Sequence, residues 1–357
     1  MAERSGLSPG GRALLFAAAT VIVIQGINQA QSVLVSFLVA VFLSMLATPP
    51  VLWLERMHLP AVAAVPLVMA GMVTVLATLG AMVGGSMNDF YGALPAYQDR
   101  LQQQVVEFQS LLAARGIVAM DKVLLDFIDP GVVMKLTARL LGAVGSALSN
   151  IVLITLAIAF ILFEASSFPV KLRAVLGDPR HVFPKFTKFV GDMERYVIIR
   201  TITSLATGLL IGTWLSVLGV DFPVLWGFLA FLLNYVPSVG SMIAATPAVL
   251  LALIQLGVGS AAAAAAGFAV ANLVLGSVIE TRLMGRKLQL STLAVFLSLM
   301  FWGSLLGPVG MVLCIPLTLT VKFACGMDEG TRWIAVVLGR DAPVESTPKV
   351  SEVADGS

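Results

Sequence analysis

The sequence predicts an all-α protein that crosses a membrane many times. Of its 357 residues, 58% are hydrophobic and only 12% are charged, whereas an average soluble chain is about 25% charged. Apolar runs recur along the chain, and about 20 apolar residues are enough for a helix to cross the bilayer core. Two of the runs also contain proline and glycine, which break helices. We therefore expect about six spanning helices and two broken or re-entrant helical hairpins, with amphipathic helices outside the membrane.

Six apolar runs have the length of ordinary spanning helices. They lie at about 12–30, 32–50, 61–86, 143–165, 200–220 and 258–280. The first follows arginines, as a signal peptide would, but no clean cleavage site comes after it, so we expect a retained helix. Two further apolar regions, 223–256 and 290–322, are longer and contain the helix breakers.

These two long regions share one design. The first contains "NYVPSVGSMIAATPAVLLAL", residues 234–253, and the second contains "LLGPVGMVLCIPLTLTV", residues 305–321. Non-helical backbone at membrane depth is tolerated where protein buries it or where it lines a wet cavity, and transporters often place substrate sites at such paired breaks. The breaks could also be kinks that only shape packing. The candidate pathway residues are Asn234, Pro237, Ser238, Gly240, Pro247, Gly307, Pro308, Gly310 and Pro316.

The distribution of basic residues predicts the orientation. The polar stretch at about 164–199 is rich in lysine and arginine, whereas the stretch at about 88–140 has no positive excess. Short loops rich in basic residues stay in the cytoplasm, so we expect the first stretch inside, the second outside, and both termini in the cytoplasm.

The loop Glu280–Lys287 tests how the broken regions cross. It carries three basic residues, Arg282, Arg286 and Lys287, and is therefore expected inside. That requires region 223–256 to enter and leave on the outer side and region 290–322 to do so on the inner side, as two opposed re-entrant hairpins. The alternative is eight plain spanning helices, which would place this basic loop outside.

The outer polar stretch is expected to contain an amphipathic helix. Apolar residues recur there at helical spacing: Leu94, Tyr97, Leu101, Val105, Phe108 and Leu112. Such a helix could lie at the membrane interface or join protomers, which makes a homo-oligomer plausible. The expected units are N-terminal transmembrane helices at 1–86, an extracytoplasmic insert at 87–142, a transmembrane core at 143–325 and a largely disordered cytoplasmic tail at 326–357.

Composition also predicts what the chain lacks. Its two cysteines, Cys314 and Cys325, lie in or beside an apolar run, and its two histidines, His58 and His181, have no ligand partners nearby in sequence. We therefore expect no metal and no cofactor. No nucleophile elbow, nucleotide-binding loop or zinc helix is present, so an enzyme is not expected. A net charge of +2 gives no reason to expect a nucleic-acid partner.

Glu280 is the most notable ionisable residue. It ends an apolar run rich in small residues, Ser260–Ser277, which favour close helix packing in lipid. Ionisable groups at membrane depth are expensive and usually functional. Glu280 could carry a proton, bind a cation, or pair with Arg282 or Arg286; it could also be a boundary carboxylate in a local salt bridge.

At these residues the chain resembles the autoinducer-2 exporter-like, or PerM-type, permease family. The likeness rests on "NYVPSVGSMIAATPAVLLAL", "IETRLMGRKLQLS" and "FWGSLLGPVGMVLCIPLTLTVK", in that order, and extends over about 10–325. One departure is that Thr281 and Arg282 stand where the family usually has a proline. The resemblance implies a multi-pass protein of the bacterial inner membrane, with signal-molecule export attributed to some members and sodium/proton antiport to others.

Three functions follow from these observations. The first is a secondary transporter or exporter of a small polar molecule, such as an autoinducer-2-like signal, with the broken helices as its pathway. The second is a sodium/proton antiporter, in which Glu280 would titrate. The third is a non-transporting membrane scaffold, in which the breaks would be dry. Water access to the breaks distinguishes the transporters from the scaffold.

Overall fold

The computed structural model describes residues 9–114, 142, 151–165, 171, 182–237, 239–284, 290–327 and 330–339. Helices account for nearly all of this part of the chain, which confirms the all-α class; its one β feature is an isolated bridge between Leu290 and Gly339. The helices are α1 (Pro9–Gln29), α2 (Gln31–Arg56), α3 (Ala61–Ala114), α6 (Ile151–Ala165), α8 (Val182–Leu218), α9 (Pro223–Leu233), α10 (Gly240–Leu256), α11 (Val258–Ala271), η1 (Asn272–Glu280), α12 (Thr281–Met284), α13 (Thr292–Met327) and α14 (Arg332–Val337).

The lengths of the helices suit a multi-pass membrane protein. Within the described residues, five stretches are long and apolar enough to cross a membrane: Gln31–Arg56, Ala61–Tyr97, Pro184–Leu218, Val258–Glu280 and Thr292–Met327. Many large apolar side chains on these helices are exposed, as expected of surfaces that face lipid. The predicted polytopic class is confirmed, while the number of six plain spanning helices stays a prediction.

The N-terminal helices pack through small residues. The buried stripe of α2 contains Ser36, Ala40, Ser44 and Ala47, spaced by three or four positions and so lying on one face. Together with Ala64 of α3, the two alanines belong to one apolar cluster with Ile154, Ile158 and Leu162 of α6. Small side chains allow helix backbones to approach closely in lipid, which brings α3 and α6 against α2.

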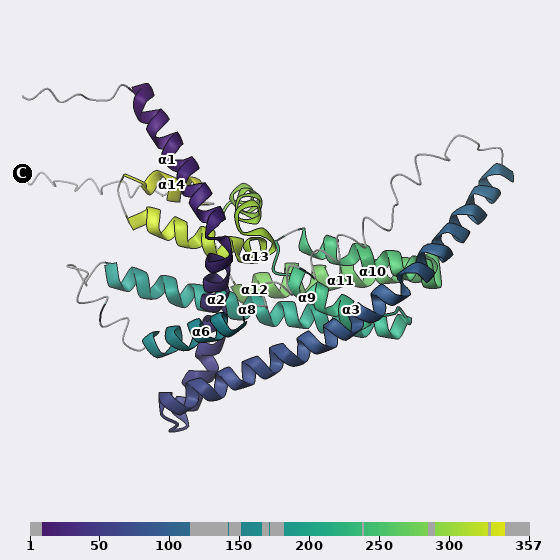
Figure 1. Ribbon diagram of the computed structural model, residues 1–357, viewed down its shortest axis with the longest axis horizontal. Helices are drawn as coiled ribbons and strands as arrows, with labels where there is room; N and C mark the ends of the chain where they lie inside the picture. The colour runs from purple at the N-terminus through teal and green to yellow at the C-terminus, as the bar shows by residue number, and fades with distance from the viewer. Residues whose placement is uncertain are drawn as a thin grey trace, which may run out of the picture.

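Helix α3 is a single helix of 54 residues, about 80 Å long at 1.5 Å per residue. Figure 1 shows it running along the molecule and beyond the end of α10. The predicted boundary between residues 86 and 87 therefore falls within a continuous helix, and the domain division stays a prediction. The segment expected to form the amphipathic helix is helical as the C-terminal part of α3, and residues 115–141 of the predicted insert at 87–142 lie outside the described residues.

Helices α8 and α9 cross at glycines. The stretch from Gly208 to Gly212 on α8 is a Gly-x-x-x-Gly motif, which lets two membrane helices approach closely. A Cβ placed on Gly208 would lie 2.7 Å from the carbonyl oxygen of Gly227 on α9, and one on Gly227 would lie 3.1 Å from the Cα of Gly212. This close crossing fixes the short helix α9 against the middle of α8.

The first broken region forms a hairpin whose two ends lie together. Asp221, two residues before α9, donates its backbone N–H to the side-chain oxygen of Gln255, near the end of α10, over 3.1 Å. With 11 residues, α9 is about 16 Å long and too short to cross a bilayer core of about 30 Å. The chain therefore enters and leaves this hairpin at one end.

The second broken region also reverses direction. At Gly307 the backbone has φ 65° and ψ −150°, which divides α13 into two halves. Trp302 Nε1 donates to Thr318 Oγ1 over 3.0 Å, although these residues would be about 24 Å apart along a straight helix. At the open end, Ser291 donates its N–H to the carbonyl of Leu338 over 3.2 Å. Both ends of this hairpin thus lie together as well.

The two hairpins open at opposite ends. Helix α11 and its continuation η1 run antiparallel to α8, because Trp214 Nε1 donates to the carbonyl of Ala263 over 3.0 Å and Arg195 donates to that of Leu283 over 3.3 Å. The first hairpin therefore opens beside Leu218 and Val258, and the second opens at the other end, beyond Met284. Figure 1 shows α9, α10 and α11 toward one end of the molecule and α13 and α14 toward the other. The described helices thus form two hairpins that open at opposite ends, while their re-entry into the membrane, as opposed to eight plain crossings, stays a prediction.

Candidate functional site

The tip of the first hairpin is a tight turn that requires glycine. Between α9 and α10 the chain turns: Val236 N–H donates to the carbonyl of Leu233 over 2.9 Å, and Val239 N–H donates to that of Pro237 over 2.7 Å. A Cβ on Gly240 would lie 1.8 Å from the carbonyl oxygen of Leu233, so only glycine fits. The break predicted at this point therefore turns the chain through a full reversal, and is more than a kink in one helix.

An arginine of α8 holds this tip. Arg200 is only 8% exposed and donates both to the backbone carbonyl of Asn234 and to the carboxylate of Glu280 at the end of η1. A buried charge is retained only where it is paired and hydrogen-bonded. One guanidinium thus connects α8, the hairpin tip and the helix that follows the hairpin.

Further polar contacts surround Arg200. Asn234 donates from Nδ2 to Ser204 Oγ over 3.0 Å, and the Tyr235 hydroxyl donates to Thr201 Oγ1 over 2.7 Å. Both α8 partners lie within one helical turn of Arg200, so the tip meets a polar face of α8. The group Arg200, Thr201, Ser204, Asn234, Tyr235 and Glu280 is called the tip cluster below.

The tip cluster keeps one donor unused. Arg200 Nε is buried, and it has no hydrogen-bond acceptor within the part of the chain that the structure describes. An unsatisfied buried donor costs about 1–3 kcal/mol, and natural structures retain few of them without a reason. A solute carrying hydroxyl or carbonyl oxygens offers the missing acceptor.

Helix η1 sets the direction of Glu280. Its nine residues, Asn272–Glu280, are π-helical, a wider form that is rare and is frequently found at functional sites. A change from α- to π-helical winding rotates every later residue relative to the earlier ones, so the face on which Glu280 lies depends on this stretch. Nothing in the run of small apolar residues predicts π-helical winding, since such a run fits an ordinary α-helix.

The structure brings together some of the predicted site residues. Asn234, Pro237 and Gly240 lie at the first tip, and Glu280 reaches it through Arg200. Pro247 is buried within α10. Ser238 and Arg286 lie outside the described residues.

Glu280 has a different partner from those expected. It pairs with Arg200, which is 80 positions away in the sequence, whereas Arg282 is exposed on α12. The expectation of a local pair with Arg282 reflected closeness in sequence, but the antiparallel packing of α8 against η1 supplies a nearer cation. The coupling role predicted for Glu280, Arg282 and Arg286 stays a prediction.

The second tip lies against the N-terminal helices. A Cβ on Gly307 would lie 3.7 Å from Gln31 Nε2 at the start of α2, and one on Gly310 would lie 2.0 Å from the carbonyl oxygen of Trp302. Pro308 and Pro316 are both within the second half of α13. In that half, Met311 and Val312 pack against the apolar cluster that includes Val236, at the first tip.

Arg200 was not among the site residues predicted from the sequence. A signal was present: the polar residues of "RTITSLAT" include Arg200, Thr203, Ser204 and Thr207, at spacings that place them on one face of a helix. All four are buried. A buried polar stripe within an otherwise apolar helix indicates a polar partner, which here is the hairpin tip.

Comparison with known proteins finds one family over nearly the whole chain. Residues 13–326 match the family described as AI-2E family transporter. The chain is 38% identical over 319 residues to the AI-2 transport protein TqsA of Escherichia coli K12, covering 89% of this chain and 92% of that protein. It is 32% identical over 339 residues to the putative transport protein YhhT of the same organism, covering 95% and 97%. A putative transport protein of Haemophilus influenzae is 33% identical over 334 residues, covering 92% and 96%.

Proposed function

The chain belongs to the AI-2E family of transporters, and we propose that it exports a small polar molecule across the bacterial inner membrane through the tip cluster. Its place in the family, with its apolar helices, makes it a multi-pass membrane transporter that works in a lipid bilayer on a small solute. The substrate class, an autoinducer-2-like signal or a related metabolite, is supported by the name of the TqsA relative. Cytoplasmic termini are supported by the distribution of basic residues.

The observation that carries the proposal is the double hold of Arg200 on the hairpin tip and on Glu280. Both bonds hold the first hairpin against α8 and η1, which keeps this end of the pathway closed. A solute rich in oxygen acceptors can bind Arg200 Nε first and then replace the Asn234 carbonyl. The tip is then released from α8, in the way that broken helices of transporters open around a central site.

No catalytic step is part of this proposal. The sequence contains no nucleotide-binding motif, so transport would run down a gradient or be coupled to a cation or proton. Glu280 is the candidate coupling residue, because it carries the charge that pairs with Arg200. Protonation of Glu280 would release Arg200 from η1 and would leave the tip carbonyl as its remaining partner.

The test uses purified protein in liposomes and measures uptake of radiolabelled autoinducer-2 and of a matched polyol. Arg200→Gln alone leaves the part-buried Glu280 carboxylate unpaired, which costs up to about 3–5 kcal/mol of stability. The informative variant is therefore R200Q/E280Q, which keeps the cluster neutral. We expect it to fold and to lose transport at least tenfold, since hydrogen bonds to charged groups contribute about 1.5–3 kcal/mol.

The control is Arg56→Gln, which removes an exposed arginine at the end of α2 and should leave flux unchanged. Unchanged flux in well-folded R200Q/E280Q would refute the pathway. A flux that requires a sodium or proton gradient, with Glu280→Gln removing only that requirement, would favour the antiporter instead. Absence of flux for every solute and ion would favour the scaffold.

A further inference from the structure

A separate cavity of about 440 Å³ lies between α8, α13 and α14. Its floor is apolar: Phe189 of α8 stacks on Phe323 of α13 with ring centroids 4.3 Å apart, and Met193 and Met327 lie beside them. The cavity is at the end where the second hairpin opens, which the distribution of basic residues places in the cytoplasm.

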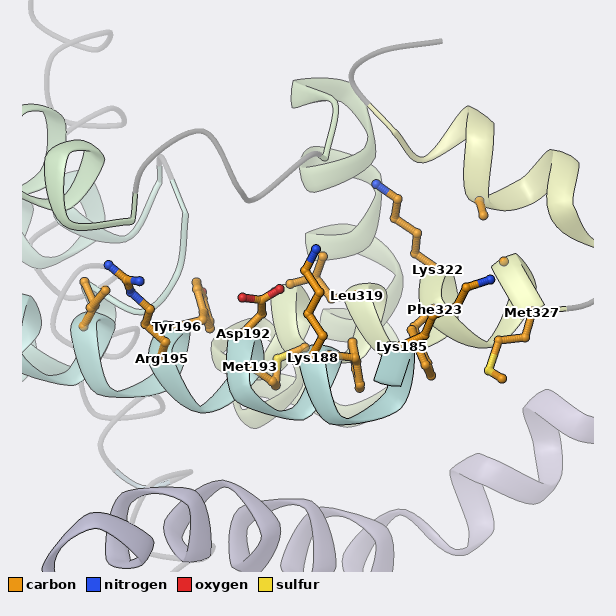
Figure 2. Close-up of a pocket in the computed structure, with 14 residues that line it drawn as sticks. Lys185, Lys188, Asp192, Met193, Arg195, Tyr196, Leu319, Lys322, Phe323 and Met327 are labelled. Carbon is orange, nitrogen blue, oxygen red and sulfur yellow. The ribbon is translucent and has the colours of Figure 1, made fainter. Parts of the chain in front are cut away.

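The rim of this cavity is strongly basic. Lys185, Lys188 and Arg195 of α8 and Lys322 of α13 line it, and Asp192 is the single carboxylate among its lining residues. Positions 185, 188, 192 and 195 share one face of α8 by their spacing. Figure 2 shows the side chains of Lys188, Asp192 and Arg195 leaving α8 on the same side, while Lys322 extends from α13. Neither Lys185 nor Lys188 takes part in an ion pair with another described residue.

We propose that this cavity binds a phosphate-bearing anionic amphiphile, with the phosphate at the basic rim and the apolar part on the Phe189–Phe323 floor. Basic pockets between membrane helices on the cytoplasmic side suit anionic lipid headgroups, and ammonium and guanidinium groups form strong charge-assisted hydrogen bonds with phosphate. A neutral polar solute carries no charge to balance these basic side chains, and none of the lining residues belongs to the tip cluster, so the two sites are distinct. The lipid of the surrounding membrane is the expected source.

A ligand in this cavity would also affect the second hairpin. A ligand held by Lys188 and Lys322 would connect α8 to the second half of α13. The two halves of α13 meet at the Gly307 break. Binding of the ligand would fix the open end of that hairpin against α8. The proposal does not depend on which solute the tip cluster transports.

The test is native mass spectrometry of the full-length protein in detergent, titrated with phosphatidylglycerol and, separately, with phosphatidylcholine. We expect the wild-type protein to bind phosphatidylglycerol in preference. The variant K188Q/K322Q should bind it about 30-fold more weakly, at about 1 kcal/mol per basic residue and 1.4 kcal/mol per factor of ten. K188R/K322R keeps both charges and should retain binding. Retained binding in this variant would show that the weaker binding of K188Q/K322Q comes from the lost charges and not from misfolding.

The matched control is R56Q/R100Q, which removes two exposed basic residues elsewhere on the chain and should leave binding unchanged. Equal weakening in both double variants, or no preference for phosphatidylglycerol, would overturn the proposal. Addition of inorganic phosphate and of glycerol phosphate distinguishes the sources. If neither compound displaces phosphatidylglycerol, the ligand is a membrane lipid. Displacement of phosphatidylglycerol that depends on Lys188 and Lys322 would overturn the assignment to a lipid and would assign the site to a soluble phosphate ester.

Discussion

Single residues decide whether the first hairpin can close. Arg200 is buried, yet its bonds go to groups that come from two other segments of the chain, Asn234 and Glu280. A buried ion pair is weak evidence of added stability, because desolvation offsets much of the attraction. Its value here is positional, since it determines where the tip of the hairpin rests.

The tip should be very sensitive to one added methyl group. In Gly240→Ala the new Cβ would meet the Leu233 carbonyl at 1.8 Å, so the turn must shift and the bond between Asn234 and Arg200 is strained. Overpacking of this kind costs about 1–3 kcal/mol, and we expect the unfolding temperature and the flux to fall together. The control is Gly259→Ala at the start of α11, where a Cβ meets nothing within 4 Å. Equal behaviour of the two variants in thermal unfolding would contradict this account of the turn.

Among the elements, the first hairpin is held at both ends. Its open end is closed by a polar group of three residues, in which the Tyr97 hydroxyl donates to Asp221 Oδ2 over 2.6 Å and Gln255 Nε2 donates to the Tyr97 oxygen over 3.0 Å. The Asp221 carbonyl also accepts from Trp226 Nε1 over 2.9 Å. Because Tyr97 belongs to α3, the long helix is fixed to the hairpin at this point.

Removing that group should loosen the hairpin without affecting its tip. Gln255→Met keeps the length of the side chain but loses its hydrogen bonds to Asp221 and Tyr97, at about 0.5–1.5 kcal/mol each. We expect lower thermal stability and faster amide hydrogen exchange in α9 and α10. Tyr97→Phe should give a smaller effect, and the double variant should be less destabilised than the sum of the two. Fully additive effects would show that the two side chains do not act as one group.

Much at the level of elements could be predicted from local sequence, and long-range pairing could not. Proline and glycine within apolar runs indicated both reversals, and the basic residues near 282–287 indicated that the hairpins oppose each other. The partner of Glu280 was expected among its neighbours, because no local pattern shows that α8 lies antiparallel to η1. The Gly208–Gly227 crossing depends on the same packing, so it too becomes visible only in three dimensions.

At the level of the whole molecule, the opposed hairpins determine which loops face which side. In the hairpin arrangement, Val258 lies at the outer end and Leu283 at the inner end, whereas eight plain crossings would exchange the two. Trp333 is on the inner side in both arrangements. All three side chains are well exposed, at 76%, 45% and 65% respectively, so each position can report its side through the reactivity of an introduced cysteine.

The measurement uses a background in which Cys314 and Cys325 are replaced by alanine, with single cysteines at positions 258, 283, 333 and 241. A membrane-impermeant thiol reagent is added from either side. We expect Val258→Cys to react from outside only, and Leu283→Cys and Trp333→Cys from inside only. Reaction of Leu283→Cys from outside would instead support eight plain crossings.

Ser241→Cys, at the hairpin tip, tests the pathway itself. Reaction from one side would show water at the tip and support transport, because a thiol reagent in water cannot reach a dry kink. No reaction from either side would support the scaffold.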